Sequence, residues 1–184
     1  MDLYHGTGKN IVDKIKKPSD FRMCIPQLTY NVTADNTKKP GSLGYGLYTF
    51  QDDLQLAKKF ADKSFNGKGT VLKIDVNVQR DEMLDLTKSE EINKFRHILE
   101  SGKNTENAKR IFDKLKSRDL KQDVYAGVAT ELVIGFAKSK GEIINFVRKR
   151  TETHFDKYKY RLGIPNGIEV TIRKKSSIVN FEEI

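Results

Sequence analysis

Three short segments of this chain carry side chains that could share one chemical task, although they are far apart in the sequence. They are His5-Gly6-Thr7, then Gly44-Tyr45-Gly46-Leu47-Tyr48-Thr49, and finally Glu169 within Ile168–Ile172. Each is a weak signal alone, because a histidine beside a glycine usually marks a turn and a glutamate on a strand usually faces solvent. Together they supply an imidazole, a phenol and a carboxylate in a fixed order along the chain.

Several familiar kinds of site are absent from the sequence. No Gly-x-Gly-x-x-Gly loop follows a first strand, and no Gly-Lys-Ser/Thr phosphate loop is present. Cys24 is the only cysteine, which excludes an internal disulfide and a Cys-based zinc site. The chain has 3 histidines, which disfavours a His-rich metal site, so we expect no metal.

In their order the three segments resemble the ADP-ribosyltransferase superfamily in its His-Tyr-Glu form, which includes poly(ADP-ribose) polymerases and diphtheria-type toxins. His5-Gly6-Thr7 matches the first family element, His-Gly-Ser/Thr. The segment 44–49 matches the second, Gly-x-Gly-Ile-Tyr-Phe. Glu169-Val170-Thr171-Ile172 matches the third, a glutamate followed by alternating apolar residues, and the apolar Ile178 stands where the family has a further apolar residue.

The resemblance covers about residues 1–65 and 165–184, and it implies NAD+ as a co-substrate. Cleavage of the N-glycosidic bond of NAD+ builds positive charge on the ribose, and a fixed carboxylate stabilises that charge. Glu169 would be this catalytic carboxylate. His5 would hydrogen-bond a hydroxyl of the adenosine ribose, and the Tyr48 ring would stack on nicotinamide. These three residues form the predicted catalytic set.

Glycines beside these residues would let the ligand approach the backbone. Gly6 lacks a Cβ, so its backbone groups could bind the nicotinamide carboxamide, with the Thr7 hydroxyl as a further partner. Gly44 and Gly46 would let the chain pass close to the dinucleotide.

The remaining NAD+ contacts are less defined by the motifs. Phe60 is the candidate for a second aromatic residue stacking on nicotinamide, although its alignment requires a one-residue shift. Tyr30 or Tyr45 could take its place. The segment 18–43 would form the loop over the dinucleotide, and Arg22 is its candidate pyrophosphate contact because it is the only arginine there.

Two other acidic residues compete with Glu169 for the catalytic role. Glu131 lies in an apolar helical stretch, Ala129–Val133, which favours a structural role. Asp75 interrupts a strongly apolar strand pattern, and the side it faces is ambiguous. Neither fits the order of the motifs as Glu169 does.

The elements that position these residues follow from hydrophobic periodicity. The pattern predicts strands at 3–5, 47–50, 70–78, 167–173 and 177–181, and helices at 9–17, 52–64 and within 88–139. Pro18 should stop the first helix. Strands at both ends and helices between them predict an α+β fold: a single catalytic domain over 1–184 with an ADP-ribosyltransferase-like split β-sheet. Its core strands would lie in about 1–80 and 165–184, with a helical insertion at about 88–150.

The charge of the chain bears on its partners. It has 34 Lys+Arg against 25 Asp+Glu, a formal net charge of +9, which suits either a solvated surface or attraction to a polyanion. No apolar run is long enough to cross a membrane, and the first residues do not form a signal peptide, so we expect a cytoplasmic protein without membrane contact.

The leading hypothesis is a mono-ADP-ribosyltransferase that modifies a macromolecular acceptor, either nucleic acid (RNA or DNA) or protein. Its size and charge suggest a bacterial or phage effector, such as a toxin of a toxin–antitoxin or phage-defence system, which would have an antitoxin protein as partner. This context is an analogy.

Three alternatives remain. A tRNA 2′-phosphotransferase shares the Leu-Tyr-His-Gly-Thr opening but needs a further His-containing motif, and residues 18–50 contain no histidine. The same fold could serve as a non-catalytic binder of nucleic acid or protein. An unrelated α+β domain would leave His5, Tyr48 and Glu169 far apart.

Overall fold

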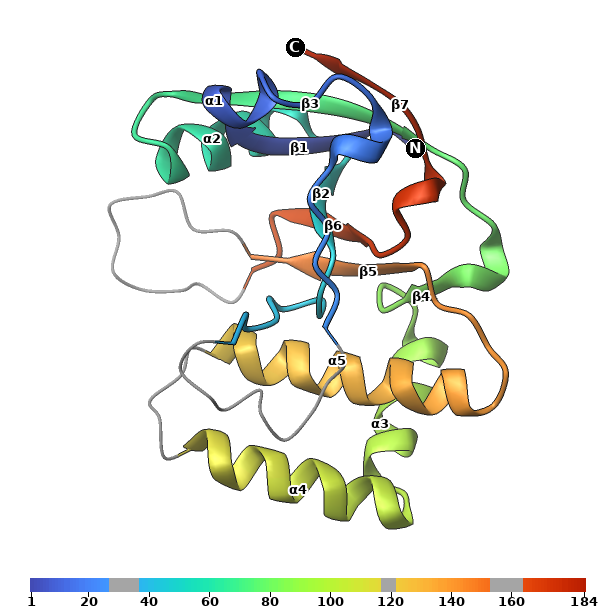
Figure 1. The fold of residues 1–184 in the computed structure, drawn as a ribbon. Coiled ribbons are helices and arrows are strands. Elements are labelled where there is room, and N and C mark those ends of the chain that lie inside the picture. The colour runs from blue at the N-terminus through green and yellow to red at the C-terminus, as the bar shows by residue number, and fades with distance from the viewer. Residues whose placement is uncertain (27–36, 117–121, 153–163) are drawn as a thin grey trace.

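The computed structural model describes residues 1–26, 37–116, 122–152 and 164–184, which form a mixed α+β fold (Figure 1). The strands are β1 (Leu3–Gly8), β2 (Leu47–Gln51), β3 (Gly69–Val76), β4 (Met83–Asp85), β5 (Phe146–Thr151), β6 (Gly167–Ile172) and β7 (Ile178–Glu183). The α-helices are α1 (Lys9–Val12), α2 (Leu54–Ser64), α3 (Ser89–Glu100), α4 (Gly102–Lys116) and α5 (Gln122–Ser139). In this part of the chain no helix is both long and apolar enough to span a membrane.

All of these strands join one sheet in the order β4-β5-β6-β2-β1-β3-β7. Its neighbouring strands are antiparallel, except that β4 and β5 are parallel. The strands that carry the three sequence motifs, β1, β2 and β6, are therefore adjacent at the centre of the sheet. Residues near the two ends of the chain come together because β6 pairs with β2 and β7 pairs with β3.

The sheet opens between β1 and β2. Strand β1 pairs with β3 along its whole length, from Leu3 to Gly8. Its register with β2 covers only two pairs, Leu3 with Gln51 and Tyr4 with Phe50. Beyond Tyr4 the two strands separate, so one edge of β1 faces a gap in the sheet. In Figure 1, β1, β3 and β7 lie together at the top, and β6, β5 and β4 lie below them.

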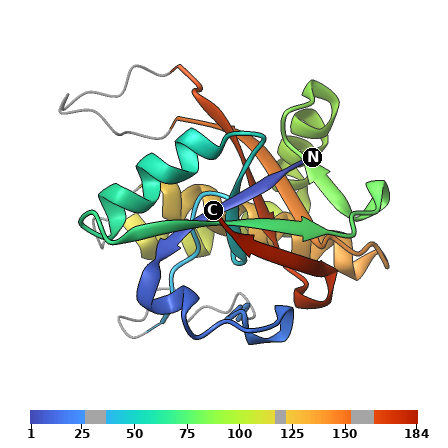
Figure 2. The same ribbon diagram turned by 90° about the horizontal axis from the view of Figure 1, so that it is seen from above.

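Helices cover the two halves of this sheet differently. Figure 2 shows α1 and α2 on opposite sides of β3. Helix α2 packs tightly on β1: a Cβ on Gly6 would lie 2.7 Å from the carbonyl oxygen of Ala57. Below the other half, α5 lies between β5 and α4 (Figure 1). Its Val133 packs with Leu43 and Val147 against the sheet.

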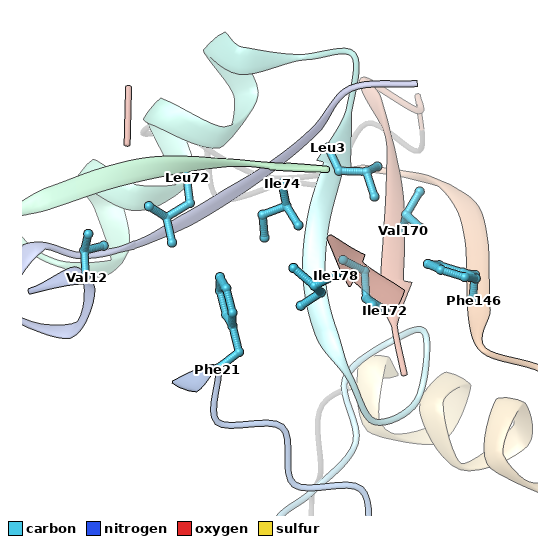
Figure 3. Packing of buried hydrophobic residues seen from close by; sticks show 9 residues of the cluster. All are labelled: Leu3, Val12, Phe21, Leu72, Ile74, Phe146, Val170, Ile172 and Ile178. Atoms are coloured by element: carbon cyan, nitrogen blue, oxygen red, sulfur yellow. The ribbon is translucent and has the colours of Figure 1, made fainter. Parts of the chain in front are cut away.

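The main core lies on the sheet face away from α5. It contains side chains from β1, β3, β5, β6 and β7, joined by Val12 of α1 and by Phe21 from the segment that follows α1 (Figure 3). Phe21 is 2% exposed and meets the Phe181 ring edge-on at 5.2 Å between centroids. Each fully buried side chain of this size contributes about 1.5–3 kcal/mol relative to an exposed one.

Two predicted elements differ in the structure. The first helix is only α1, and Pro18 begins a short 3-10 turn (Pro18–Asp20) rather than simply stopping a helix that runs to residue 17. The helical insertion ends at Ser139 and not near 150, because residues 146–151 form β5 inside the sheet. The basic run Arg148-Lys149-Arg150 resembles a solvated surface, but Asp85 and Glu169 supply its counter-charges within the fold.

Candidate functional site

A cavity of about 360 Å³ lies where the sheet opens, and all three motifs reach it. Its lining residues are His5, Gly6 and Thr7 from β1, Gly46 and Leu47–Phe50 at β2, Phe60, Ser64 and Phe65 from the α2 region, and Glu169 from β6. The walls are largely apolar and aromatic, with a single carboxylate among the lining residues. Small-molecule sites commonly have this composition, an apolar pocket with few polar groups that orient the ligand.

The His5 imidazole bridges the gap between β1 and β2. Its Nδ1 lies 2.7 Å from the backbone oxygen of Tyr48. A carbonyl oxygen can only accept a hydrogen bond, so Nδ1 carries the proton. Burial lowers the pKa of His5 below its ordinary value, and the ring is therefore neutral near pH 7. Its Nε2 is left as a hydrogen-bond acceptor.

The Tyr48 phenol is fixed by the loop that precedes β2. Its hydroxyl accepts a hydrogen bond from the Leu43 amide and donates one to the Gly44 carbonyl oxygen, both at 2.8 Å. Burial raises the pKa of Tyr48 well above its usual value. The phenol therefore stays protonated, and its part in the site is to provide a rigid aromatic wall.

Glu169 faces the same region from β6. Its position is opposite Phe50 of β2 on one side and Lys149 of β5 on the other. One carboxylate oxygen lies 3.4 Å from the Ser42 hydroxyl, and Thr151 also hydrogen-bonds the carboxylate. Burial raises the pKa of Glu169 above its ordinary value. Among the described residues, the hydroxyls of Ser42 and Thr151 are its hydrogen-bond partners, and two such bonds leave lone pairs of the carboxylate for a ligand.

An aromatic pair forms another wall of the cavity. Phe60 contacts Phe50 edge-on, with 5.7 Å between the ring centroids. Phe60 is 37% exposed although it is a large apolar side chain, so its ring is accessible to a ligand that enters the cavity. A flat aromatic ligand could stack on such a ring.

A buried ion pair holds the loop before β2. Arg173 donates to both carboxylate oxygens of Glu131, at 2.5 and 3.0 Å, and the Tyr45 amide donates to the same carboxylate at 2.6 Å. Arg173 also donates to the Tyr45 carbonyl oxygen at 2.7 Å. Helix α5 thus fixes the loop that carries Gly44 and Gly46. This is the structural role that the sequence favours for Glu131.

The structure brings together most of the residues that the sequence singles out. His5, Gly6, Thr7, Gly46, Tyr48, Phe60 and Glu169 line the one cavity. The need for glycine at position 6 has a further cause, because its Cβ direction points into α2 rather than towards open space. At Gly46, a Cβ would lie 2.7 Å from the Ile172 carbonyl oxygen, so this glycine lets the chain pass close to β6.

Two predicted ligand contacts are not in the cavity. Tyr45 is 3% exposed, and its hydroxyl donates to the Lys38 carbonyl oxygen, so it anchors the loop instead of stacking on a ligand. Arg22 is exposed and is not among the lining residues. Tyr30 lies outside the described residues. Asp75 is exposed, with the Asn180 amide 3.5 Å away, and has no place in the cavity.

Sequence reasoning missed the neighbours of Glu169. Thr151 of β5 and Ser42 of the loop before β2 hydrogen-bond its carboxylate, and Lys149 of β5 is its partner in the strand register. Once residues 146–151 are assigned to a strand, alternation puts Lys149 on one face with Val147 and Thr151. Only the pairing of β5 with β6 shows that Glu169 is on this face. Phe65, directly after α2, is a further aromatic residue of the cavity that the motifs do not contain.

A second cavity of about 1020 Å³ lies between β4, α3 and α5, and no predicted site residue lines it. Its charged side chains include Asp85 and Arg148, which pair with each other through two hydrogen bonds. The chain matches no protein-family model, no curated protein sequence and no solved structure.

Proposed function

We propose that the chain is an NAD+-dependent mono-ADP-ribosyltransferase that modifies a macromolecular acceptor. The observation that carries this proposal is the convergence of His5, Tyr48 and Glu169, from three strands, on a single cavity. An unrelated α+β domain would give these residues no reason to meet. The environment of each side chain also suits the role that the proposal gives it.

The carboxylate of Glu169 supplies the main electrostatic effect. The bond between C1′ of the ribose and the nicotinamide nitrogen breaks, and its electron pair leaves with neutral nicotinamide. Positive charge develops on the ribose, which the ionised carboxylate stabilises. The acceptor nucleophile then bonds to C1′ and loses its proton to Glu169 or to water. When the acceptor is water, the product is free ADP-ribose.

The other two motif residues bind rather than react. The neutral His5 ring leaves Nε2 to accept a hydrogen bond from a ribose hydroxyl. Nicotinamide would lie between the aromatic side chains of Tyr48 and Phe60. A volume of about 360 Å³ suits the nicotinamide and its ribose, with the rest of the dinucleotide extending beyond the cavity.

The test compares wild type with Glu169→Gln. Wild type should release nicotinamide from NAD+, and the variant should lose about 10³-fold or more in rate while still binding NAD+. Glu142→Gln, at an exposed glutamate of the second cavity, is the matched control and should retain full activity. If wild type neither binds NAD+ nor releases nicotinamide with any cell extract, the proposal is wrong and the result favours the non-catalytic binding module.

The acceptor class is tested with biotinylated NAD+. Total cell extract is labelled and then digested separately with protease and with nuclease. Label that nuclease removes assigns a nucleic-acid acceptor, which suits the net charge of +9. Label that protease removes assigns a protein acceptor. A nucleic-acid acceptor also predicts that transfer weakens steeply with salt.

A further inference from the structure

Strands β5 and β6 place a lysine directly beside the proposed catalytic carboxylate. Lys149 and Glu169 are opposite each other in the antiparallel register. Side chains at such paired positions lie on the same face, with Cβ atoms about 4.5–5.5 Å apart. The neighbouring pairs confirm which face this is. Val147 packs towards α5 and Leu43, whereas Phe146 points into the main core on the other side.

The groups that surround Glu169 come from several elements. Thr151 and Lys149 belong to β5, Ser42 belongs to the loop before β2, and Asp123 lies near the start of α5. Tyr48 approaches from β2, where its own pKa responds to the charge of Glu169, and the neutral His5 lines the same cavity. Burial and Asp123 oppose ionisation of Glu169, while Lys149 and the two hydroxyls favour it.

We propose that Lys149 is a positioning residue whose charge helps to keep Glu169 ionised in its partly buried place. This inference rests on the proposed function, because the developing positive charge on the ribose needs an ionised carboxylate. A lysine suits the task since its ammonium is a point charge on a flexible stem. An arginine fork, such as Arg173 on Glu131, occupies both carboxylate oxygens. The point charge leaves oxygen lone pairs free for the ribose.

The functional test is the pH dependence of nicotinamide release by Lys149→Gln. Loss of the ammonium removes a group that favours the ionised form, so the carboxylate protonates at higher pH. We expect the variant to lose about tenfold in rate at pH 6 and to come within about twofold of wild type at pH 9. Lys149→Arg keeps the positive charge, so the pH dependence should have the wild-type shape, but at a lower rate because a guanidinium can occupy both carboxylate oxygens. The matched control is Arg150→Gln, on the opposite strand face and exposed, which should overlay wild type.

Two results would overturn the inference. A loss that is equal at every pH would mean that Lys149 acts on something other than Glu169 ionisation. An unchanged profile for nicotinamide release, with loss of transfer to the macromolecule alone, would mean that Lys149 contacts the acceptor. Lys149→Met replaces Lys149→Gln if the latter does not fold.

A second measurement separates this inference from the proposed function. Proteins labelled with ¹³C at the glutamate side-chain carboxyl carbon are titrated by NMR, with Glu169→Gln used to assign the signal. The Glu169 midpoint should be higher in Lys149→Gln than in wild type, whether or not NAD+ is a substrate. If wild type is active but the Glu169 midpoint is the same in Lys149→Gln, only the role of Lys149 is rejected and the proposed function stands. A moved midpoint in a protein that never releases nicotinamide rejects the enzyme activity and leaves the electrostatic pairing in place.

Discussion

Glu131 and Glu169 are two enclosed carboxylates with opposite surroundings. Arg173 donates two hydrogen bonds to Glu131, and the Tyr45 amide donates a third. Both carboxylate oxygens are therefore occupied by groups of the protein itself. Glu169 receives hydroxyl hydrogen bonds and the charge of Lys149. A saturated carboxylate holds the chain in place, whereas an unsaturated one beside a cavity is available to a ligand.

The same contrast separates the acidic residues of two cavities, the one of about 1020 Å³ lined by Asp85 and the one of about 360 Å³ lined by Glu169. In the larger one, burial would raise the pKa of Asp85, but hydrogen bonds from Arg148 and Thr87 bring it far below its usual range. These charged groups already satisfy one another. In the smaller cavity, burial raises the pKa of Glu169, and no guanidinium is among the lining residues. The environment of the carboxylate, and not the size of the cavity, therefore separates a structural region from a candidate site.

The largest expected effect comes from breaking the Glu131–Arg173 pair. Glu131→Ala leaves the Arg173 guanidinium buried without its partner, and we expect the free energy of unfolding to fall by about 3–5 kcal/mol. Urea denaturation followed by circular dichroism measures this. The double variant Glu131→Ala/Arg173→Met should recover part of the loss, because no unpaired charge remains. A loss below about 1 kcal/mol in the single variant would show that the ion pair does not hold the loop.

The loop itself gives the next effect. Gly44 has a φ of +80°, and a Cβ there would overlap a carboxylate oxygen of Glu131. Gly44→Ala should therefore lower the free energy of unfolding by about 1–3 kcal/mol. Gly67 has a similar φ of +75° with open space around it, so Gly67→Ala carries only the backbone cost. Equal losses in the two variants would mean that the approach of Glu131 to the loop is not close.

On the cavity side, Phe60→Ala should affect the ligand more than the fold. The ring is partly exposed and touches Phe50 by its edge, so the stability change should stay under about 1 kcal/mol. If Phe60 stacks on nicotinamide, NAD+ affinity should fall about tenfold, close to 1.4 kcal/mol. Calorimetric titration measures the affinity, and Phe60→Tyr should retain it. An unchanged affinity in Phe60→Ala would remove Phe60 from the site.

The fold was predictable from sequence where one strand face is continuously apolar. Leu72, Ile74 and Val76 share one face of β3, and Ile168, Val170 and Ile172 share one face of β6. Strand β5 was not predictable in this way, because its basic residues have partners far away in the sequence. Arg148 pairs with Asp85, 63 residues before it. Only the folded sheet brings such charges together, so a run of basic residues alone does not indicate a strand.

The candidate site was predictable as far as its motifs extend. Their order places His5, Tyr48 and Glu169 on three strands, and adjacent strands bring them together. Tyr45 and Arg22 belong to irregular segments whose direction depends on backbone turns and tertiary contacts. The positive φ values at Gly44 and Gly46 turn Tyr45 away from the cavity, and neither its type nor its spacing reveals this.

The smallest expected effect concerns the stability cost of Glu169. Burial raises its pKa in the folded state above the unfolded value near 4.5, so the folded protein binds the proton more tightly. The favourable contribution is then present at low pH and is lost as the pH rises through the folded pKa. Glu169→Gln removes this dependence, and at pH 8 it should be more stable than wild type by about 1 kcal/mol or less.

Thermal unfolding at several pH values measures the difference between the two proteins. The advantage of Glu169→Gln should shrink towards pH 4, where wild-type Glu169 gains its proton in both states. Glu131→Gln is the matched comparison, because it replaces a carboxylate that Arg173 needs, and it should be less stable than wild type at pH 8. Opposite signs for the same chemical change at the two positions would show that Glu131 stabilises the fold and that Glu169 is retained at a cost. A destabilised Glu169→Gln at pH 8 would instead make both glutamates structural.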